Sequence, residues 1–233
     1  MSSDRPSAVP SPGPDNPDEA ARVREANTSQ FGLGSLVRMR GAPLIEALDR
    51  HLPGSREHAE ATASYAFATA VELRFDRSRS ELVREAAKLH DVGKLYVPAR
   101  LLTEDPASLS DADRAQLDGE SEAAYHIAQG AGIAANVSDW IRRAGRRFDG
   151  AGNEGPAEEA IPIESRIIRA ACACDSVLAR SDAAAGADLD TRRGNAIIAL
   201  KRQSGTELDP RVVAAFAAVL DRATASASGM SRN

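Results

Sequence analysis

Apolar residues recur at the three- to four-residue spacing of an α-helix from Leu36 onward, and the strict alternation typical of a β-strand is almost absent. Alanine, the residue with the strongest preference for helix, fills many of the remaining positions. The pattern predicts an all-α fold, built as a single helical bundle. We expect its helices at residues 36–51, 55–74, 79–90, 111–129, 133–144, 163–180, 190–203 and 210–226.

Side chains that cap helices mark several of these starts. A Ser, Thr or Asp just before a helix accepts a hydrogen bond from a backbone N–H of the first turn, and an acidic residue three positions later can bond back. The expected caps are Ser55, Ser78 with Glu81, Ser110 with Asp113, and Asp209 followed by Pro210 at the first helical position.

The two ends of the chain differ from the rest. Residues 1–32 hold prolines at positions 6, 10, 12, 14 and 17 among Ser, Asp and Gly. This composition buries too little apolar surface to offset the entropy of ordering, so we expect a disordered tail. Such a tail is either a solubilising extension or an arm that binds a partner. Residues 33–227 then form one helical domain, and residues 228–233 a flexible C-terminus.

Bulk charge and cysteine content exclude several classes of protein. The net charge of -5 and the isoelectric point near 5.5 argue against general nucleic-acid binding. Cys172 and Cys174 point to different sides of an expected helix and cannot pair comfortably, which fits a reducing compartment. The N-terminus lacks the apolar segment of a secretory signal, and the longest apolar run, residues 212–220, is too short to cross a bilayer. We therefore expect a cytoplasmic protein without membrane association.

The strongest candidate for chemistry is the run His90-Asp91-Val92-Gly93-Lys94, because such a sequence seldom arises from core packing. His58 lies in the second expected helix, and two antiparallel helices could bring it to His90 and Asp91. Two imidazoles and a carboxylate can ligate a divalent metal, and Lys94 can face a phosphate as a point charge. We expect Asp91 and Lys94 to be catalytic in an active enzyme. The alternative for His58 is an ordinary packing role.

Residues 90–94 resemble the HDxGK signature of the HD phosphohydrolase superfamily, and the chain from about residue 58 to 216 resembles its HD-GYP branch. Each further motif is weak alone, and the combination is specific. Asp149-Gly150-x-Gly152 resembles the DGxGYP loop, Ile161-Pro162-x-Glu164 resembles the IPLEARII helix start, and Leu208-Asp209-Pro210 resembles the closing FDPxVV.

The resemblance implies a helical domain that uses two or three metals, often iron or manganese, to hydrolyse the bacterial second messenger cyclic di-GMP. The metal-ligand positions of the HD-GYP branch match this chain at His58, His90 and Asp91. Asp175 matches a further acidic position of the branch. The other expected ligands fall at Glu120, Ala144, Gly145, Arg146 and Cys172, and the GYP tripeptide is broken after Gly152.

These departures predict a reduced metal site. Ala and Gly coordinate nothing, so a second metal is unlikely to bind and cleavage of cyclic di-GMP should be lost or weak. His58, His90 and Asp91 could still hold one divalent ion, Zn, Mn or Fe, with Cys172 as a fourth ligand. Cys172 could equally be a small core residue. Glu120 is either a further carboxylate ligand or part of a solvated helix face.

A concentrated basic stretch, residues 142–147, lies where the resemblance places metal ligands. We hypothesise that Arg146 and Arg147, with Lys94 and with Asp149 of the Gly-rich loop 148–156, bind a phosphate-bearing ligand such as a cyclic dinucleotide. The alternative is an exposed polar helix face. A buried carboxylate needs a partner, so Asp175 is expected to pair with an arginine, Arg166 or Arg169.

Three functions remain open. The first is a degenerate HD-GYP-like signalling domain of a bacterial pathway, acting as a ligand-binding or protein-interaction module with a signalling protein or a second copy as partner. The second is an active metal-dependent HD phosphohydrolase with a mononuclear site. The third is a helical dimerisation unit with vestigial polar residues.

Overall fold

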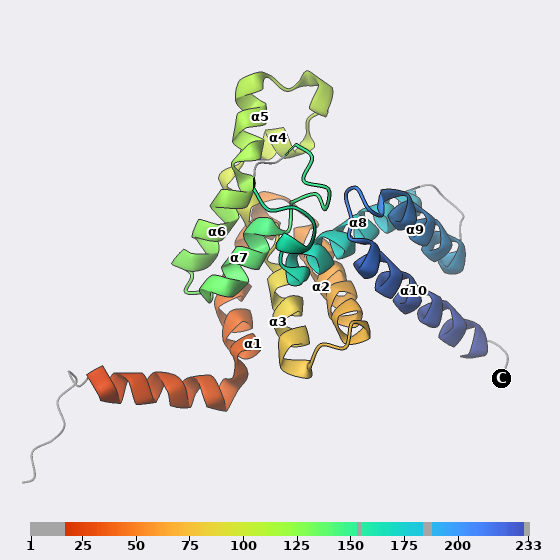
Figure 1. Cartoon of the computed structure of the whole chain (residues 1–233). Helices are drawn as coiled ribbons and strands as arrows, with labels where there is room; N and C mark the ends of the chain where they lie inside the picture. Colours follow the sequence, from red (N-terminus) through yellow and green to blue (C-terminus); the bar gives the residue numbers. More distant parts are fainter. Residues whose placement is uncertain (1–16, 153–154, 184–187, 231–233) are drawn as a thin grey trace, which may run out of the picture.

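The computed structural model describes residues 17–152, 155–183 and 188–230 (Figure 1). Within these ranges the regular structure is helical and no β-strand forms, which confirms the expected all-α class. The helices are α1 (Pro17–His51), α2 (Ser55–Glu72), α3 (Arg77–Lys88), α4 (Ala99–Thr103), α5 (Asp111–Asp118), α6 (Glu120–Gly130), α7 (Ala135–Arg143), α8 (Ile163–Ala183), α9 (Leu189–Gln203) and α10 (Pro210–Met230), with short 3₁₀ helices η1 (Val92–Tyr96), η2 (Pro106–Ser108) and η3 (Glu158–Ala160).

Each expected helical segment overlaps an observed helix, but several boundaries differ. α1 begins at Pro17, so residues 17–32 are helical where the sequence predicted a disordered tail. Proline suits the first helical position because its missing N–H would have no partner there. Residues 1–16 of the expected tail, and 231–233 of the expected flexible C-terminus, lie outside the described residues. The helix expected at 111–129 is divided at Gly119 into α5 and α6.

The cap predictions have mixed outcomes. Ser110 forms the expected capping box at α5, and the Asp209 carboxylate accepts a hydrogen bond from the Arg211 N–H at the start of α10. The prediction for Ser78 is wrong because α3 begins earlier, where Asp76 accepts from the Arg79 N–H. The prediction for Ser55 is also wrong. That residue is already the first of α2, and its hydroxyl donates to the Leu52 carbonyl.

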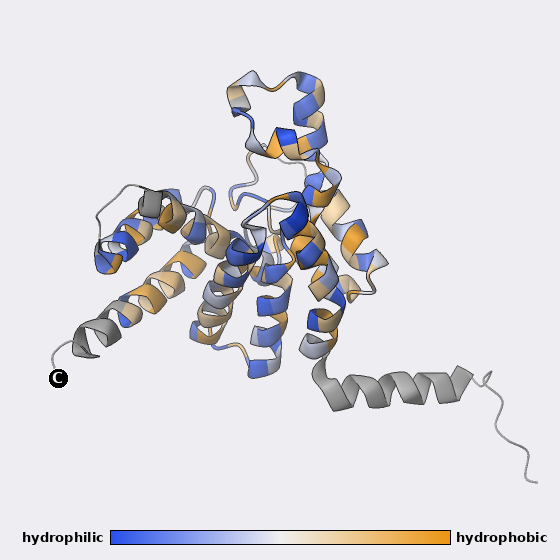
Figure 2. Ribbon diagram, turned by 180° about the vertical axis from the view of Figure 1, so that it is seen from behind, coloured by the Kyte–Doolittle hydropathy of each residue, from blue (hydrophilic) through white to orange (hydrophobic). Residues whose placement is uncertain are grey.

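The main core surrounds α2. Its buried face is made of alanines spaced three or four residues apart, namely Ala59, Ala63, Ala66 and Ala70. Small side chains let neighbouring helices approach closely, and α2 packs against both α3 and α8. Figure 2 shows polar and apolar residues interspersed along each helix, as expected for helices with one buried face.

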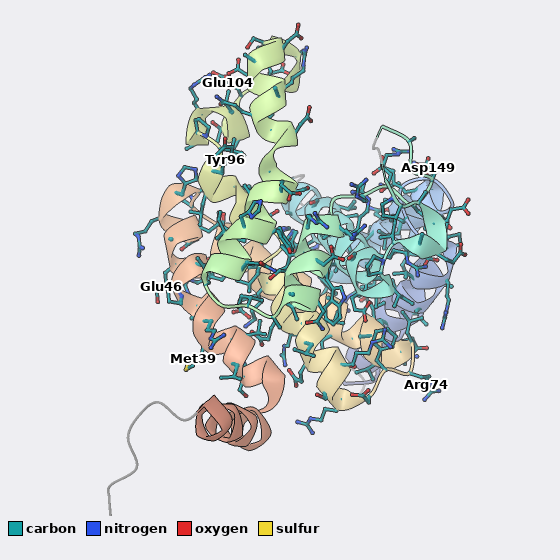
Figure 3. All side chains as sticks on the ribbon, turned by 60° about the vertical axis from the view of Figure 1, so that its left-hand side comes forward. Met39, Glu46, Arg74, Tyr96, Glu104 and Asp149 are labelled. Atoms are coloured by element: carbon teal, nitrogen blue, oxygen red, sulfur yellow. The ribbon has the colours of Figure 1, made fainter. Side chains whose placement is uncertain are left out.

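Helices α4 and α5 form a projection from this body (Figure 1). They have a separate apolar cluster of Val97, Leu101 and Leu109, packed against two partly buried leucines. Figure 3 shows Tyr96 at the base of the projection and Glu104 farther out. The projection therefore depends on its own small core and on the chain segments that join it to η1 and α6.

Close backbone contact at Gly93 ties η1 to the start of α6. A Cβ atom at this position would lie 2.1 Å from the Glu120 carbonyl oxygen, which no side chain tolerates. Glycine is therefore required for α6 to begin beside η1. This contact brings Glu120 toward the His90–Lys94 segment.

Among the described residues, none of the helices combines the length and the apolarity needed to cross a bilayer.

Candidate metal centre

His58 lies in the first turn of α2 and points toward α8. Gly54 precedes the helix with a φ of 92°, the left-handed conformation that reverses the chain after α1. The Nδ1 atom of His58 lies 2.6 Å from a carboxylate oxygen of Asp175 on α8. A carboxylate on one ring nitrogen fixes the tautomer and leaves Nε2 available as a metal ligand.

His90 is oriented in a similar way by the backbone. It follows α3, and its Nδ1 atom lies 2.8 Å from the Ala87 carbonyl oxygen. Its Nε2 atom lies 3.4 Å from Nε2 of His58. Both imidazoles therefore present the same nitrogen to one point, each with its other nitrogen bonded.

Cys172 and Asp91 complete the cluster. The Cys172 sulfur lies 3.8 Å from His58 Nε2, and one donor atom each from His58, His90 and Cys172 lies within 4.8 Å of the others. Asp91 places its two oxygens 3.6 Å from His58 Nε2 and 3.3 Å from His90 Nε2. Lys94 donates to Asp91 at 2.6 Å. His58, His90 and Cys172 therefore form a group that could hold a metal ion, with Asp91 beside it, and the role of Asp91 as a metal ligand stays a prediction.

The donor set fits a single tetrahedral ion. Ligands bound to zinc at about 2.0–2.3 Å lie roughly 3.3–3.8 Å from one another around a tetrahedron. For the two histidines and Cys172, the separations of 3.4 Å between the Nε2 atoms and 3.8 Å between the sulfur and His58 Nε2 fall in that range. Among the described residues, Asp91 is not one of the donors that gather within 4.8 Å, although one of its oxygens lies near each Nε2 atom. Two imidazoles, a thiolate and a carboxylate are also ligand types that zinc accepts.

The pKa values of the residues in the cluster depend strongly on the charges of their neighbours. The hydrogen bonds with Asp175 and Cys172 raise the pKa of His58 to about 10 despite burial. Burial alone would lower the pKa of His90, but the charges of Asp91 and Cys172 raise it to about 9. Burial alone would raise the pKa of the Cys172 thiol, and His90 together with hydrogen bonds from both imidazoles lowers it to about 6. The metal-free cluster therefore pairs imidazolium with thiolate and carboxylate.

A pocket of about 230 Å³, called the metal pocket below, opens beside the cluster. It is lined by cluster members, by residues of α8, by the end of α7, by the start of α6 and by the turn before α10. The lining residues are His90, Asp91, Glu120, Ser121, Ile141, Ala144, Gly145, Arg169, Cys172, Ala173, Glu207 and Leu208.

Glu120 lies in this pocket and not on an open helix face. Burial, with the nearby charge of Asp91, raises the pKa of Glu120 to about 7. Among the described residues, Glu120 is not one of the donors that gather within 4.8 Å. Its role as a metal ligand stays a prediction.

The arginines singled out from the sequence lie outside the metal pocket. Arg147 donates two hydrogen bonds to Asp149, at 3.0 and 2.7 Å, and a third to Glu207. Arg146 lines a neighbouring pocket of about 380 Å³. Asp149 lies on the loop at the edge of the molecule (Figure 3). Ligand binding by Arg146, Arg147 and Asp149 stays a prediction.

The prediction that Asp175 pairs with an arginine is wrong. Asp175 bonds to His58, whereas Arg166 pairs with Asp209 and Arg169 pairs with Glu207. The reason is packing between helices, because Asp175 meets His58 of α2 while both arginines meet acidic residues at the start of α10 and in the turn before it.

Arg169 and Glu207 line the metal pocket and were not identified from the sequence as site residues. A signal for the arginine existed, since Arg169, Cys172 and Asp175 are spaced three apart in one helix. Glu207 reaches the pocket from the turn before α10, so only the packing of that turn could reveal it.

Comparison with known proteins gives consistent matches. The model of the HD domain family matches residues 43–212. The cyclic di-GMP phosphodiesterase response regulator RpfG of Xanthomonas campestris pv. campestris is 27% identical over 176 residues, which is 74% of this chain. The match spans only 45% of that relative's length.

Solved structures share the fold. The HD domain of the L. monocytogenes phosphodiesterase PgpH in complex with cyclic-di-AMP has a TM-score of 0.55 at 15% identity, and the match covers 82% of this chain and 98% of that one. Bd1817, an HDG"Y"P protein from Bdellovibrio bacteriovorus, has a TM-score of 0.55 at 18% identity, covering 88% of this chain and 66% of that one.

Proposed function

The chain belongs to the HD domain family, and from this premise we propose that it is a signalling domain of a bacterial pathway that holds one divalent metal ion and binds a phosphate-bearing ligand. In this proposal the phosphodiesterase activity on cyclic di-GMP is lost or weak. The domain then acts by binding its ligand, a signalling protein or a second copy of itself.

One observation supports the proposal above all, the gathering of His58, His90 and Cys172 around one point with Asp91 beside them. Both imidazoles are held by hydrogen bonds on Nδ1, as metal-binding histidines usually are. The thiolate favours zinc over manganese, because soft sulfur ligands suit zinc.

The part of the pocket formed by the end of α7 supports a single ion. Ala144 and Gly145 line it and have no side-chain donor. Two-metal cleavage of a phosphodiester needs a second cation to stabilise the leaving oxygen while the first activates water. Because Ala144 and Gly145 offer no ligand to that cation, hydrolysis of a cyclic dinucleotide should be slow.

The residues of the cluster have separate tasks in ligand binding. A bound divalent ion would polarise a phosphoryl oxygen as a Lewis acid. Asp91 accepts a hydrogen bond from Lys94 and keeps that ammonium beside the cluster. Lys94 is therefore positioned to contribute positive charge to a phosphate group.

Metal analysis of cysteine variants tests the proposal. Cys172→Ala should lower zinc content well below one ion per chain and abolish the sulfur-to-metal charge-transfer band of the cobalt-substituted protein. Cys174→Ala is the matched control, since Cys174 lies on the same helix but is fully buried in the core. Wild-type protein with two ions per chain and rapid cleavage of cyclic di-GMP would overturn the proposal.

A second candidate is an active phosphohydrolase with a mononuclear site. It is favoured by the intact grouping of His58, His90, Asp91 and Lys94 beside an open pocket. Turnover of a nucleotide monoester by protein with one ion per chain would favour this candidate. Binding of a cyclic dinucleotide without turnover would favour the first.

A further inference from the structure

Arg169 places a fixed positive charge in the metal pocket. It lies on α8 three residues before Cys172, so the two side chains share one face of the helix. Both line the pocket with His90 and Asp91. Among the described residues that form this pocket, Arg169 is the only arginine. A phosphate bound at the metal cluster would therefore share the pocket with one guanidinium.

Three hydrogen bonds hold that guanidinium in place. Nη1 donates to the Gly145 carbonyl at 2.6 Å, Nε donates to the Glu207 carbonyl at 3.1 Å, and Nη2 donates to the Glu207 carboxylate at 2.9 Å. A guanidinium has five N–H donors. Within the described part of the chain, one hydrogen on each terminal nitrogen is left for a ligand. An oriented, planar donor group of this kind suits a phosphate.

The neighbouring arginines are engaged elsewhere. Arg142 and Arg143 both donate to Asp139, at 2.9 and 2.8 Å. Arg147 donates twice to Asp149. None of these arginines lines the metal pocket. The arginine charge that lines the pocket therefore comes from α8 and not from the basic stretch at residues 142–147.

Glu207 is the group that a phosphate would compete with. Its carboxylate is shared by Arg169, at 2.9 Å, and Arg147, at 3.0 Å, and its side chain is 40% exposed. Glu207 could keep Arg147 as a partner if a phosphate took its place on Arg169. The exchange would leave no buried charge unpaired, which keeps its energetic cost low.

We propose that Arg169 is a specificity-determining residue that binds a phosphate group in this pocket, between the metal cluster and Glu207. This inference rests on the proposed function, because it names the recognition group for the ligand of that same site. Arg169 supplies a charge that does not titrate at working pH and needs no second metal. Arg169 thus makes the pocket select nucleotides with an accessible phosphate and reject neutral nucleosides.

Calorimetry on zinc-loaded protein tests the inference, with cyclic di-GMP and GMP as probes and guanosine as the neutral comparison. Arg169→Gln should weaken the affinity for both phosphate probes by roughly 10- to 100-fold, the loss typical of a hydrogen bond to a charged group. Arg169→Lys should give an intermediate affinity, because lysine keeps the charge and loses the planar fork. Zinc content should be unchanged in both variants.

Arg193→Gln is the matched control. Arg193 pairs with Asp190 on α9 and is 19% exposed, close to the 21% of Arg169, but it does not line the pocket. The Arg193→Gln variant should bind both probes as the wild type does. Equal affinity of wild type and folded Arg169→Gln would refute the role of Arg169 and leave the metal site intact. Wild type that binds zinc but neither probe would contradict ligand binding in the proposed function as well.

Glu207→Gln provides a second measurement in case Arg169→Gln does not fold. It removes the competing carboxylate and keeps the Glu207 backbone carbonyl that anchors Nε. Phosphate affinity should rise severalfold. An unchanged or lower affinity would overturn the inference.

Discussion

At the scale of single residues, the candidate metal cluster is defined by the groups that orient its two histidines. Asp175 holds His58 through Nδ1, and the Ala87 carbonyl holds His90 in the same way. The ligands alone therefore describe only part of the site, because the groups behind them fix the tautomer and direction of each ring.

Asp175→Asn should weaken zinc binding roughly 10- to 100-fold, the usual effect of losing a group that orients a histidine ligand. The amide keeps the size of the side chain and removes its charge. Competition with a chromophoric chelator measures the change. Asp221→Asn, at an exposed position on α10, is the control and should bind zinc as the wild type does. Wild-type affinity in Asp175→Asn would show that the contact is structural only.

Zinc binding should depend steeply on pH. Folded metal-free protein has His58 with a pKa of about 10 and His90 with a pKa of about 9, so both rings are protonated at pH 7. Zinc binds the neutral imidazole, so it must displace these protons. Cys172, with a pKa of about 6, is already a thiolate and releases none.

Apparent zinc affinity should rise as pH increases from 6 and level off above about pH 10, where His58 is neutral without metal. Calorimetry at pH 7 in buffers of different ionisation enthalpy should report about two protons released per zinc. Release of no proton would contradict an imidazolium state of the free cluster.

At the scale of helices, the start of α10 is tied to α8 by a buried ion pair. Asp209 caps α10 through the Arg211 N–H, and its other carboxylate oxygen accepts from Arg166 of α8. The Asp209 side chain is 4% exposed. The turn before α10 includes Glu207, so this pair also positions a wall of the metal pocket.

Asp209→Ala should lower the free energy of unfolding by roughly 3–5 kcal/mol, because it leaves the Arg166 charge buried without its partner. Urea denaturation followed by circular dichroism measures the loss. The double variant Asp209→Ala with Arg166→Met should recover part of it, since the unpaired charge is then absent. No recovery would indicate that the helix cap contributes more than the ion pair.

At the scale of the whole molecule, the site joins helices from both halves of the chain. His58 comes from α2, His90 and Asp91 follow α3, and Cys172 comes from α8. α2 packs against both α3 and α8, so these elements form the centre of the bundle. A metal ion bound to these residues would connect α2, α8 and the end of α3 within the core, and would so stabilise the native state.

Removal of zinc should therefore lower the thermal midpoint. A ligand that binds only the folded state stabilises it by about 2.7 kcal/mol at a free concentration one hundred times its dissociation constant. Differential scanning calorimetry with zinc and with a chelator measures the difference. Cys172→Ala should show a smaller shift than Cys174→Ala. Equal midpoints with and without zinc in the wild type would contradict binding at the core.

The sequence by itself determined the helical class and part of the site. Each helix predicted from apolar spacing overlaps an observed helix, but the short helix α4 and the first half of α1 were not predicted. The run from His90 to Lys94 was recognisable because a His, an Asp, a Gly and a Lys stand close together in one short segment. Gly93 belongs to the same run, and its backbone contact with Glu120 explains why only glycine fits there.

Tertiary structure decided the choices that local pattern left open. It placed Cys172 with the histidines and Cys174 in the core, although both lie on one helix two residues apart. It gave Asp175 to His58 and brought Arg169 and Glu207 into the pocket. The physical reason is that a helix fixes which residues share a face, whereas only packing against other helices decides what that face meets.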